Sequence, residues 1–147
     1  ASRESGLEGD GGPSSLNGLR ILVAEDNEIN RLLIRRILEK AGCVVSEAVN
    51  GREAVKMALE GTHDAILMDV QMPEIDGLEA TKRIRDAGKV GLPIVALTAH
   101  AFQHDVQDCL AAGMNAFLSK PVQAAALRAK LAELTAGVRP VIYRSTS

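Results

Sequence analysis

Short continuous apolar runs alternate along the chain with longer segments in which apolar residues recur every three or four positions. A continuous apolar run is typical of a strand covered on both faces, whereas the three-to-four spacing is typical of a helix. The strand pattern occurs at residues 20–25, 43–48, 64–70, 92–99 and 115–120. The helical pattern occurs at residues 27–41, 50–61, 75–87, 100–113 and 122–136. This alternation predicts a doubly wound α/β domain with a five-stranded parallel sheet and about five helices.

The segment after the first apolar run has clear helix signals. Asn27 can cap its start and Gly42 can end it. The apolar positions of this segment recur at helical spacing: Ile29, Leu32, Leu33, Ile37 and Leu38. The sequence therefore predicts an amphipathic helix directly after the first strand.

The composition changes at both ends of this pattern. Residues 1–18 are rich in Gly and Ser and have little to bury, which indicates a flexible linker or an expression remnant. The folded domain is expected over residues 19–136, followed by a tail at 137–147 with one β-prone run, VIY. The chain shows no signal-peptide pattern, so we expect a cytoplasmic part of a longer or processed protein.

Composition narrows the classes of function. Of the 147 residues, 46% are hydrophobic and 24% are charged, as in an ordinary globular protein. The formal net charge of −2 gives no basic footprint for nucleic acid or for an acidic membrane surface. No apolar stretch approaches the roughly 20 residues that a membrane-spanning helix needs. Cys43 and Cys109 form no CxxC pattern and are expected to be buried free thiols in a reducing compartment.

Charged and hydroxyl side chains gather where the predicted strands end. Glu25 and Asp26 end the first run, Asp69 the third, Thr98 the fourth and Lys120 the fifth. In a doubly wound sheet these ends share one edge, which is where such folds bind ligands. Taken singly, each of these residues is more often a loop residue or a helix cap. The joint pattern is what indicates a site.

The combination suits phosphoryl chemistry. Neighbouring carboxylates repel by about 4 kcal/mol per pair at 4 Å and an effective dielectric of 20, which a divalent cation would offset. Mg²⁺ prefers a few carboxylates together with water and phosphate oxygens. Lys120 could then neutralise an incoming phosphoryl oxygen, and Thr98 could hydrogen-bond another. Asp69 is thus predicted to be a carboxylate nucleophile that accepts a phosphoryl group as an acyl phosphate.

Four short motifs at these strand ends resemble the signature of two-component receiver domains, the phospho-accepting modules of response regulators and hybrid sensor kinases. The motifs are EDN at 25–27, MDVQMPEIDG at 68–77, LTA at 97–99 and SKP at 119–121. The resemblance covers residues 19–136 and implies the flavodoxin-like strand order 2-1-3-4-5. It also implies a phosphohistidine donor, carried by a histidine kinase domain or by a histidine phosphotransfer protein.

The resemblance implies a role for each residue of the site. Asp69 is similar to the family's phosphoacceptor, and Thr98 and Lys120 are similar to the residues that contact the phosphoryl group. The implied ligands of Mg²⁺ are Asp26, Asp69, the backbone carbonyl of Gln71 and, through water, Glu25. Phe117 stands where the family has its switch aromatic, paired with Thr98. The Lys120–Pro121 bond is expected to be cis.

The sequence departs from the family's pattern at few positions. Glu25 stands where the family more often has Asp, which lengthens one carboxylate without changing its charge. Phe117 has no hydroxyl, so its movement would be a packing change alone. Gln71 and His100 occupy positions that vary within the family and influence how long the phosphoryl group lasts.

Other interpretations of these residues are open at this point. His100 and His104 have the spacing of a zinc pair, although no Glu follows the first His as in the zinc proteases. A haloacid-dehalogenase-like phosphohydrolase would need an acid where the chain has Gln71. A flavodoxin-like module would need a phosphate-binding loop where EDNEIN is acidic. A contact-only pseudo-receiver would normally have lost Asp69, Lys120 or the acidic pair.

The runs DNEINR, LTAHA and SKPV resemble receivers fused to histidine kinases. A hybrid sensor kinase is therefore the preferred parent, with a stand-alone or differently fused regulator as the alternative. The parent could be membrane-anchored, but this segment is expected to face the cytoplasm without contacting the membrane. The predicted docking surface for a histidine-bearing partner helix consists of Ile29, Asn30, Leu33, Pro121 and Val122. The competing interpretation places Ile29 and Leu33 in the core.

Overall fold

The five apolar runs form the strands of one sheet, and the segments between them form helices. A computed structural model describes residues 16–99 and 103–136, with residues 103–105 described by their backbone alone. The strands are β2 (Arg20–Ala24), β3 (Val44–Ala48), β4 (Ala65–Asp69), β5 (Ile94–Thr98) and β6 (Ala116–Ser119). The helices are α1 (Glu28–Lys40), α2 (Gly51–Glu60), α3 (Gly77–Asp86), α4 (Gln103–Ala112) and α5 (Ala124–Leu134).

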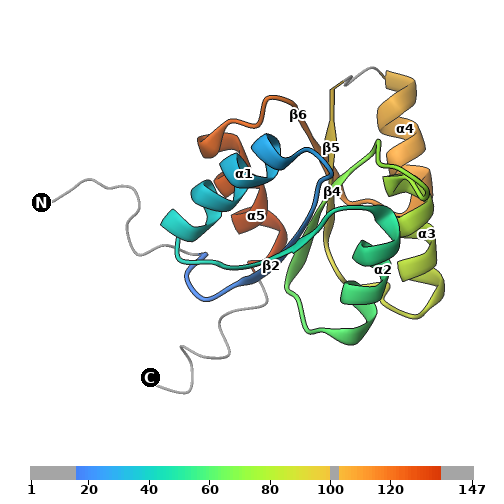
Figure 1. Cartoon of the computed structure of the whole chain (residues 1–147), viewed down its shortest axis with the longest axis horizontal. Coiled ribbons are helices and arrows are strands. Elements are labelled where there is room, and N and C mark those ends of the chain that lie inside the picture. Colours follow the sequence, from blue (N-terminus) through green and yellow to red (C-terminus); the bar gives the residue numbers. More distant parts are fainter. Residues whose placement is uncertain (1–15, 100–102, 137–147) are drawn as a thin grey trace, which may run out of the picture.

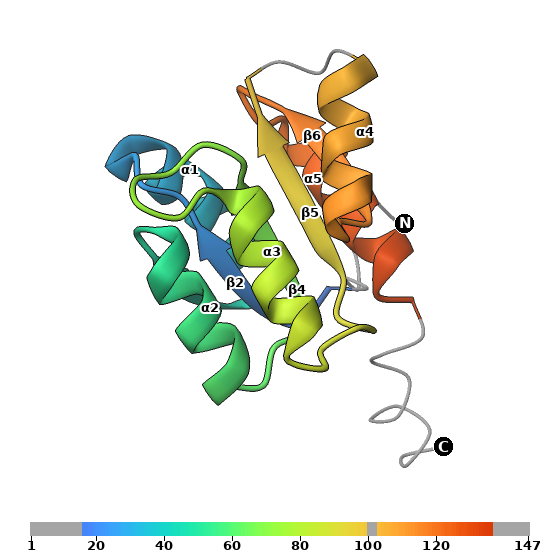
Figure 2. The same cartoon turned by 90° about the vertical axis from the view of Figure 1, so that its right-hand side faces the viewer.

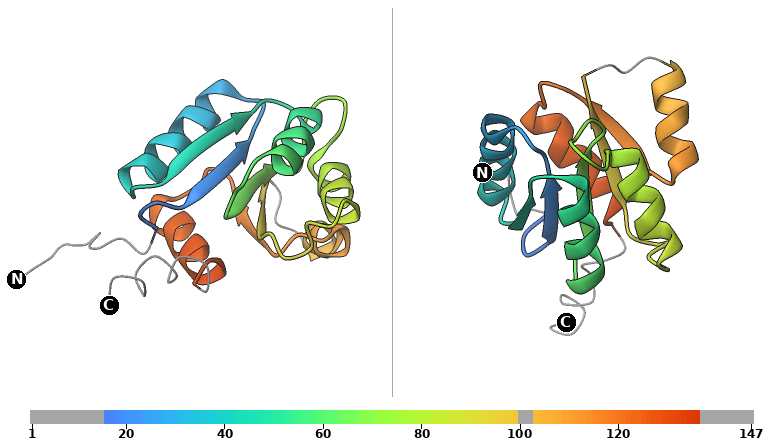
Figure 3. Two further views of the ribbon diagram at one scale, coloured as in Figure 1. Left: turned by 90° about the horizontal axis from the view of Figure 1, so that it is seen from below. Right: turned by 45° about the vertical axis from the view of Figure 1, so that its right-hand side comes forward.

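All five strands run parallel in the order β3-β2-β4-β5-β6, which is 2-1-3-4-5 along the chain and confirms the predicted doubly wound fold. Helices α1 and α5 cover one face of the sheet, and α2, α3 and α4 cover the other (Figures 1 and 3). Every residue of β4 and β5 is buried. Strands covered on both faces have no polar side to show, which explains the continuous apolar runs.

The sheet separates two apolar cores. Sheet residues pack on one face against α1 and α5 through Ile34, Leu38, Leu127 and Leu131. On the other face the helices contribute mostly smaller side chains, Ala54, Ala58, Ala80 and Cys109, together with Ile84. Among the described residues neither core contains an aromatic side chain, as the composition predicts. Cys43 and Cys109 are both buried and neither forms a disulfide, which agrees with the expectation from their spacing.

Side-chain caps determine where helices begin. Asn27 Oδ1 accepts a hydrogen bond of 2.9 Å from the backbone N–H of Asn30 at the start of α1. Asp76 Oδ1 accepts one of 2.8 Å from Glu79 in the same way. The apolar spacing predicted that this helix begins at Ile75. Because Asp76 is the cap, α3 instead begins at Gly77.

The apolar positions of α1 do not all face the sheet. Ile34 and Leu38 are buried, but the exposed fractions of Ile29, Leu32 and Leu33 are 76%, 46% and 45%. The interpretation that placed Ile29 and Leu33 in the core is therefore wrong. The first half of α1 carries an apolar surface that is turned to solvent.

The described chain begins three residues before the predicted domain boundary at Leu19. Leu16 is 2% exposed and belongs to the core under α1 and α5. Its carbonyl accepts a hydrogen bond of 3.0 Å from the N–H of Leu19. The Gly18 N–H donates to the Gly42 carbonyl at 2.9 Å, which ties this segment to the loop between α1 and β3. Leu16 therefore packs as a part of the domain.

Several expectations concern residues outside the described part, which excludes 1–15, 100–102 and 137–147. They include the run VIY and the first residues of the helix predicted over 100–113, which is described from Gln103 onward. Within the described residues, none of the helices has the length and apolar character needed to cross a membrane.

Candidate functional site

The carboxyl ends of the parallel strands meet at one edge of the sheet, toward which the arrowheads of β2 and β5 point in Figure 2. Asp69 is the last residue of β4 and Thr98 the last residue of β5. Glu25 directly follows β2, and Lys120 directly follows β6. Glu25, Asp69 and Thr98 are buried, whereas Asp26 is exposed. The topology thus gathers at one edge the residues predicted from the strand ends.

One ammonium group contacts two buried carboxylates. Lys120 Nζ lies 2.8 Å from Asp69 Oδ2 and 3.1 Å from Glu25 Oε1. The side chain of Glu25 is 0% exposed and that of Asp69 is 4% exposed, so water screens these contacts weakly. Backbone N–H groups hold the other carboxylate oxygens. Gln71 donates to Asp69 Oδ1 and Asn27 donates to Glu25 Oε2, each at 3.1 Å.

This crowding changes how the site titrates. Burial raises the pKa of Glu25 to about 7, and a hydrogen bond with Asp69 and the charge of Asp69 add to the rise. Burial alone would lower the pKa of Lys120, but the hydrogen bonds and charges of Asp69 and Glu25 outweigh it and raise that pKa. Burial and the charge of Asp69 therefore favour the protonated form of Glu25, and a bound cation would favour release of that proton.

Three carboxylates lie close enough to share one cation. One oxygen from each of Glu25, Asp26 and Asp69 lies within 4.8 Å of the others, and no second such cluster occurs among the described residues. Gln71 and Lys120 line the same open cleft. A few hard oxygen donors beside an open cleft fit Mg²⁺, which keeps several of its waters when bound. The donor set therefore fits the predicted cation.

The loop after β4 brings its backbone against Asp69. The Gly77 N–H donates to the Val70 carbonyl at 2.8 Å. A Cβ atom on Gly77 would overlap the backbone oxygen of Asp69, so a larger residue would push the start of α3 away from the strand end. Gly77 therefore helps to position Asp69.

Comparison with known families agrees with this geometry. The family described as the response regulator receiver domain matches residues 21–132, which is more than half of the chain. The chain belongs to this family. The match favours the receiver over the dehalogenase-like and flavodoxin-like interpretations of the same strand ends.

Curated relatives of this receiver domain include large kinases. It is 45% identical over 125 residues to the osmosensing histidine protein kinase SLN1 of Saccharomyces cerevisiae, over 80% of this chain and 10% of that protein. It is 43% identical over 116 residues to the hybrid signal transduction histidine kinase B of Dictyostelium discoideum, over 71% of this chain and 6% of that protein. The receiver domain thus spans about a tenth or less of the length of these two relatives.

Solved structures also resemble the receiver domain. One is the receiver domain of the sensor histidine kinase PA1611 from Pseudomonas aeruginosa, whose structure has a magnesium ion coordinated in the active-site cleft. It is 40% identical with a TM-score of 0.77, over 82% of this chain and 99% of that one. Another is from a Saccharomyces cerevisiae co-crystal of the histidine phosphotransfer protein Ypd1 with the receiver domain of Ssk1. It is 37% identical with a TM-score of 0.77, over 82% of this chain and 90% of that one.

A small groove lies beside the acidic cleft of the receiver domain. Its lining includes most of the predicted docking residues: Asn30, Leu33, Pro121 and Val122, together with Glu25, Ile34 and Lys120. Ile29 is exposed on the same helix but is not part of this lining. The Lys120–Pro121 bond at the rim of the groove is cis, as the resemblance implied.

Two further predictions concern the edge of the sheet near β6. Phe117 pairs with Ala96 and Thr98 pairs with Ser119, so both predicted switch residues lie in neighbouring strands. Phe117 is 37% exposed, which leaves it room to repack, and its switch role stays a prediction. For the zinc hypothesis, His100 and the side chain of His104 lie outside the described residues.

Sequence analysis missed one residue of the site. Arg31, on α1, donates from Nη1 to the backbone carbonyl of Glu25 at 2.9 Å. Arg31 is the last residue of the run DNEINR, but the sequence pattern does not predict the orientation of its guanidinium. Its contact depends on the loop geometry between β2 and α1.

Proposed function

We propose that this receiver domain accepts a phosphoryl group from a phosphohistidine onto Asp69. The supporting observation is a carboxylate that is 3% exposed at the edge of an acidic cleft, with Lys120 at one oxygen and the Gln71 N–H at the other. In the transfer, the P–N bond of the phosphohistidine breaks while a P–O bond forms to an oxygen of Asp69. The imidazole leaves with the electron pair of the P–N bond, and the product is an acyl phosphate.

The neighbouring residues have defined tasks in this proposal. Lys120 Nζ would shift its hydrogen bond from the carboxylate to a phosphoryl oxygen, and the Thr98 hydroxyl would donate to another. The groups that would hold Mg²⁺ are the side chains of Glu25, Asp26 and Asp69 and the backbone carbonyl of Gln71. When bound, Mg²⁺ would neutralise charge on the phosphoryl oxygens.

The phosphorylated state is expected to be transient and to change the packing of the surface around Phe117. The cleft is open to water, so we expect slow self-dephosphorylation of Asp69. Movement of Thr98 toward the phosphoryl group would loosen the packing beside it, and Phe117 on the neighbouring strand would repack. Because Phe117 has no hydroxyl, this response would be a change of packing rather than a new hydrogen bond.

The proposed partner is a helix that carries the donor histidine, on a histidine kinase domain or a histidine phosphotransfer protein. The exposed apolar side chains Ile29 and Leu33 and the groove at Pro121 and Val122 would receive such a helix beside the acidic cleft. A receiver resembling this one was crystallised with the phosphotransfer protein Ypd1. Asn30, between the two apolar residues, offers polar contacts at the rim.

The proposed parent is a hybrid sensor histidine kinase, because the curated relatives described above include proteins of that name. A stand-alone or differently fused regulator is the alternative. In either case we expect the receiver domain to work in the cytoplasm, where histidine kinases use ATP, even if another part of the parent is anchored in a membrane.

The chemical step is tested by incubating the chain with Mg²⁺ and acetyl phosphate and recording the intact mass. We expect one added phosphoryl group that is lost on treatment with hydroxylamine. Asp69→Asn and a chelator should each prevent it, whereas Asp86→Asn, the same change on the surface of α3, should not. No adduct, together with no effect of Mg²⁺ on the melting temperature, would favour a contact-only pseudo-receiver.

The docking surface is tested by rates of phosphotransfer from a phosphorylated histidine phosphotransfer protein. Leu33→Ala should slow the transfer at least about fivefold because it removes apolar contact at the groove. Leu59→Ala, on α2, is the matched control, since Leu59 is also partly exposed at 39% but lies away from the groove. Equal rates for the two variants would refute the docking surface.

A further inference from the structure

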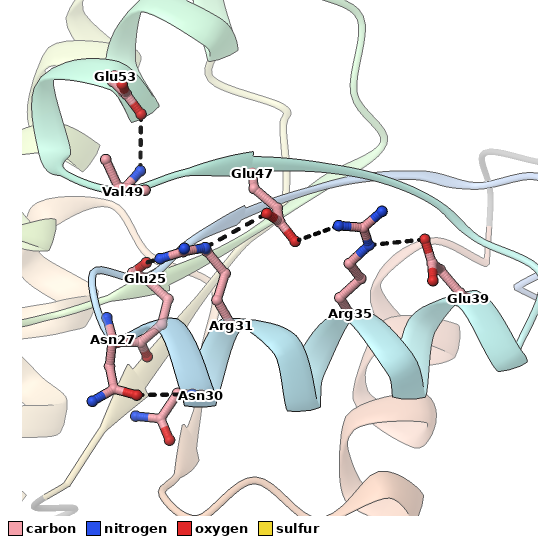
Figure 4. A network of polar contacts seen from close by, with 9 residues as sticks. All are labelled: Glu25, Asn27, Asn30, Arg31, Arg35, Glu39, Glu47, Val49 and Glu53. Carbon is pink, nitrogen blue, oxygen red and sulfur yellow. Dashed lines mark hydrogen bonds and ion pairs between the residues drawn. The ribbon is translucent and has the colours of Figure 1, made fainter.

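A row of ion pairs runs along α1 beside the acidic cleft (Figure 4). Arg31 Nε lies 3.5 Å from Glu47 Oε1 on β3, and Arg35 Nη1 lies 3.3 Å from the other oxygen of Glu47. Arg35 Nε also pairs with Glu39 at 3.0 Å. The two arginines differ in burial, because the side chain of Arg31 is 16% exposed and that of Arg35 is 49% exposed. Arg31 is thus the less exposed of the two arginines in this row of ion pairs.

Arg31 also contacts the cation site through the backbone. Its Nη1 donates at 2.9 Å to the carbonyl of Glu25, which belongs to the peptide group that joins Glu25 to Asp26. Figure 4 shows the guanidinium of Arg31 between this carbonyl and the carboxylate of Glu47. Glu25 precedes this peptide group and Asp26 follows it. The orientation of the peptide group therefore sets the directions in which both acidic side chains leave the backbone.

Other contacts also restrain the loop that carries the two acids, but they act at different atoms. The Glu25 N–H donates to the Ala48 carbonyl at 3.0 Å, and the Glu25 carboxylate contacts the Asn27 N–H and Lys120 Nζ, each at 3.1 Å. None of these contacts involves the carbonyl of Glu25. The planar guanidinium of Arg31 has one N–H on that carbonyl and another toward Glu47, so it links the loop to β3.

We propose that Arg31 is a positioning residue for the divalent cation. Arg31 holds the Glu25–Asp26 peptide so that both carboxylates point toward the same ion. Glu47 keeps the guanidinium of Arg31 aimed at the loop. The inference rests on the proposed function, because it assigns to Arg31 a part in the binding of Mg²⁺ at that site. Groups that orient metal ligands commonly change metal affinity about 10–100-fold when they are removed.

Arg35 provides an internal comparison. It belongs to the same row of ion pairs and carries the same charge, but among the described residues it bonds to Glu39 and Glu47 and not to Glu25 or Asp26. Its partners are Glu39, which is half exposed, and Glu47, which it shares with Arg31; ion pairs of a half-exposed arginine contribute little to stability. A loss of charge near the site is therefore separable from a loss of the contact to the Glu25 carbonyl.

The test measures the dissociation constant of Mg²⁺ by calorimetry at pH 8 and the melting temperature in chelator, on the full chain. We expect Arg31→Gln to raise the dissociation constant about tenfold and Arg35→Gln to change it less than about twofold. Arg31→Lys keeps the charge but not the planar fork, so it should still raise the constant at least about threefold. A residue that only supported the fold would lower the melting temperature without changing the Mg²⁺ affinity.

Three outcomes would overturn the inference: an unchanged Mg²⁺ constant in both Arg31 variants, an equal rise in Arg35→Gln, or full rescue by Arg31→Lys. If Arg31→Gln does not fold, Arg31→Lys and Arg35→Gln still decide it. Wild-type protein that binds no Mg²⁺ would instead refute the cation site of the proposed function, and this inference with it. Normal Mg²⁺ binding by the wild type with no effect at Arg31 would refute this inference alone.

Discussion

At the level of single residues, the cleft concentrates negative charge around one cationic side chain. Lys120 contacts both Asp69 and Glu25, and Asp26 adds a third carboxylate from the exposed side. Neighbouring carboxylates repel strongly when they are partly buried, and a single ammonium cannot neutralise all of them. The arrangement is therefore strained electrostatically until a cation binds, and removing one carboxylate has a measurable effect.

Asp69→Asn is expected to raise the free energy of unfolding in chelator by about 1 kcal/mol, because the loss of repulsion outweighs the loss of the contact with Lys120. The same substitution should abolish most of the stabilisation by Mg²⁺. Chemical denaturation with and without Mg²⁺ measures both effects. A variant that is less stable than wild type in chelator would contradict the prediction.

The raised pKa of Glu25 predicts a pH dependence of stability in chelator. Below its ordinary pKa of 4.5, Glu25 is protonated in both the folded and the unfolded chain. Between pH 4.5 and about 7, the unfolded chain has released this proton while the folded protein keeps it, so stability falls as pH rises through this window. The slope should be smaller in Glu25→Gln, whose side chain does not titrate. Equal slopes in wild type and variant would show that Glu25 titrates normally.

At the level of elements, the loop between β4 and α3 determines where Asp69 stands. Asp76 caps α3, and Gly77 follows it with its Cα against the backbone of Asp69. A cap and a glycine at adjacent positions therefore fix both the start of the helix and its distance from the strand. This dependence makes Gly77 sensitive to substitution although it has no side chain to contribute.

Gly77→Ala is expected to lower the free energy of unfolding by about 2–4 kcal/mol, because its Cβ would overlap the Asp69 carbonyl. It should also slow phosphorylation by acetyl phosphate, since the displaced backbone carries Asp69, the proposed phosphoacceptor. Gly91→Ala is the control, because a Cβ at Gly91 meets no atom within 4 Å. Equal stability of the two variants would contradict this account of the loop.

The elements themselves were largely predictable from the sequence. The strands have no solvated face, so their apolar runs stand out, and the carboxyl-end residues of the site follow from the topology alone. The faces of α1 were less predictable, because Ile29, Leu32 and Leu33 continue the apolar spacing beyond the part that the sheet covers. The contact of Arg31 with the Glu25 carbonyl was not predictable, since it depends on the path of a loop.

At the level of the whole molecule, the core extends beyond the predicted start of the domain. Leu16 is buried with side chains from α1 and α5, although the segment around it reads as linker by composition. A single leucine in a Gly- and Ser-rich stretch is a weak signal, and its burial depends on a cavity that only the assembled fold provides.

Leu16→Ala is expected to lower the free energy of unfolding by about 2–4 kcal/mol, as for other leucines truncated in a packed core. The same substitution at the partly exposed Leu59 should change it by no more than about 0.5 kcal/mol. Urea denaturation in the presence of Mg²⁺ measures both. Equal effects would mean that the segment before Leu19 does not contribute to the folded core.

The parallel topology also determines where the domain can be joined to the rest of a longer protein. Because every helix returns the chain to the amino end of the next strand, the start of β2 and the last turn of α5 lie near the edge opposite the acidic cleft (Figure 1). A five-residue strand spans about 16 Å, which separates the two edges of the sheet. A flexible tether of on the order of ten residues is needed for a phosphohistidine donor on the same protein to reach the acidic cleft. Tether length would then set the effective concentration of phosphohistidine at Asp69, while the points of attachment leave the rim of the cleft unobstructed.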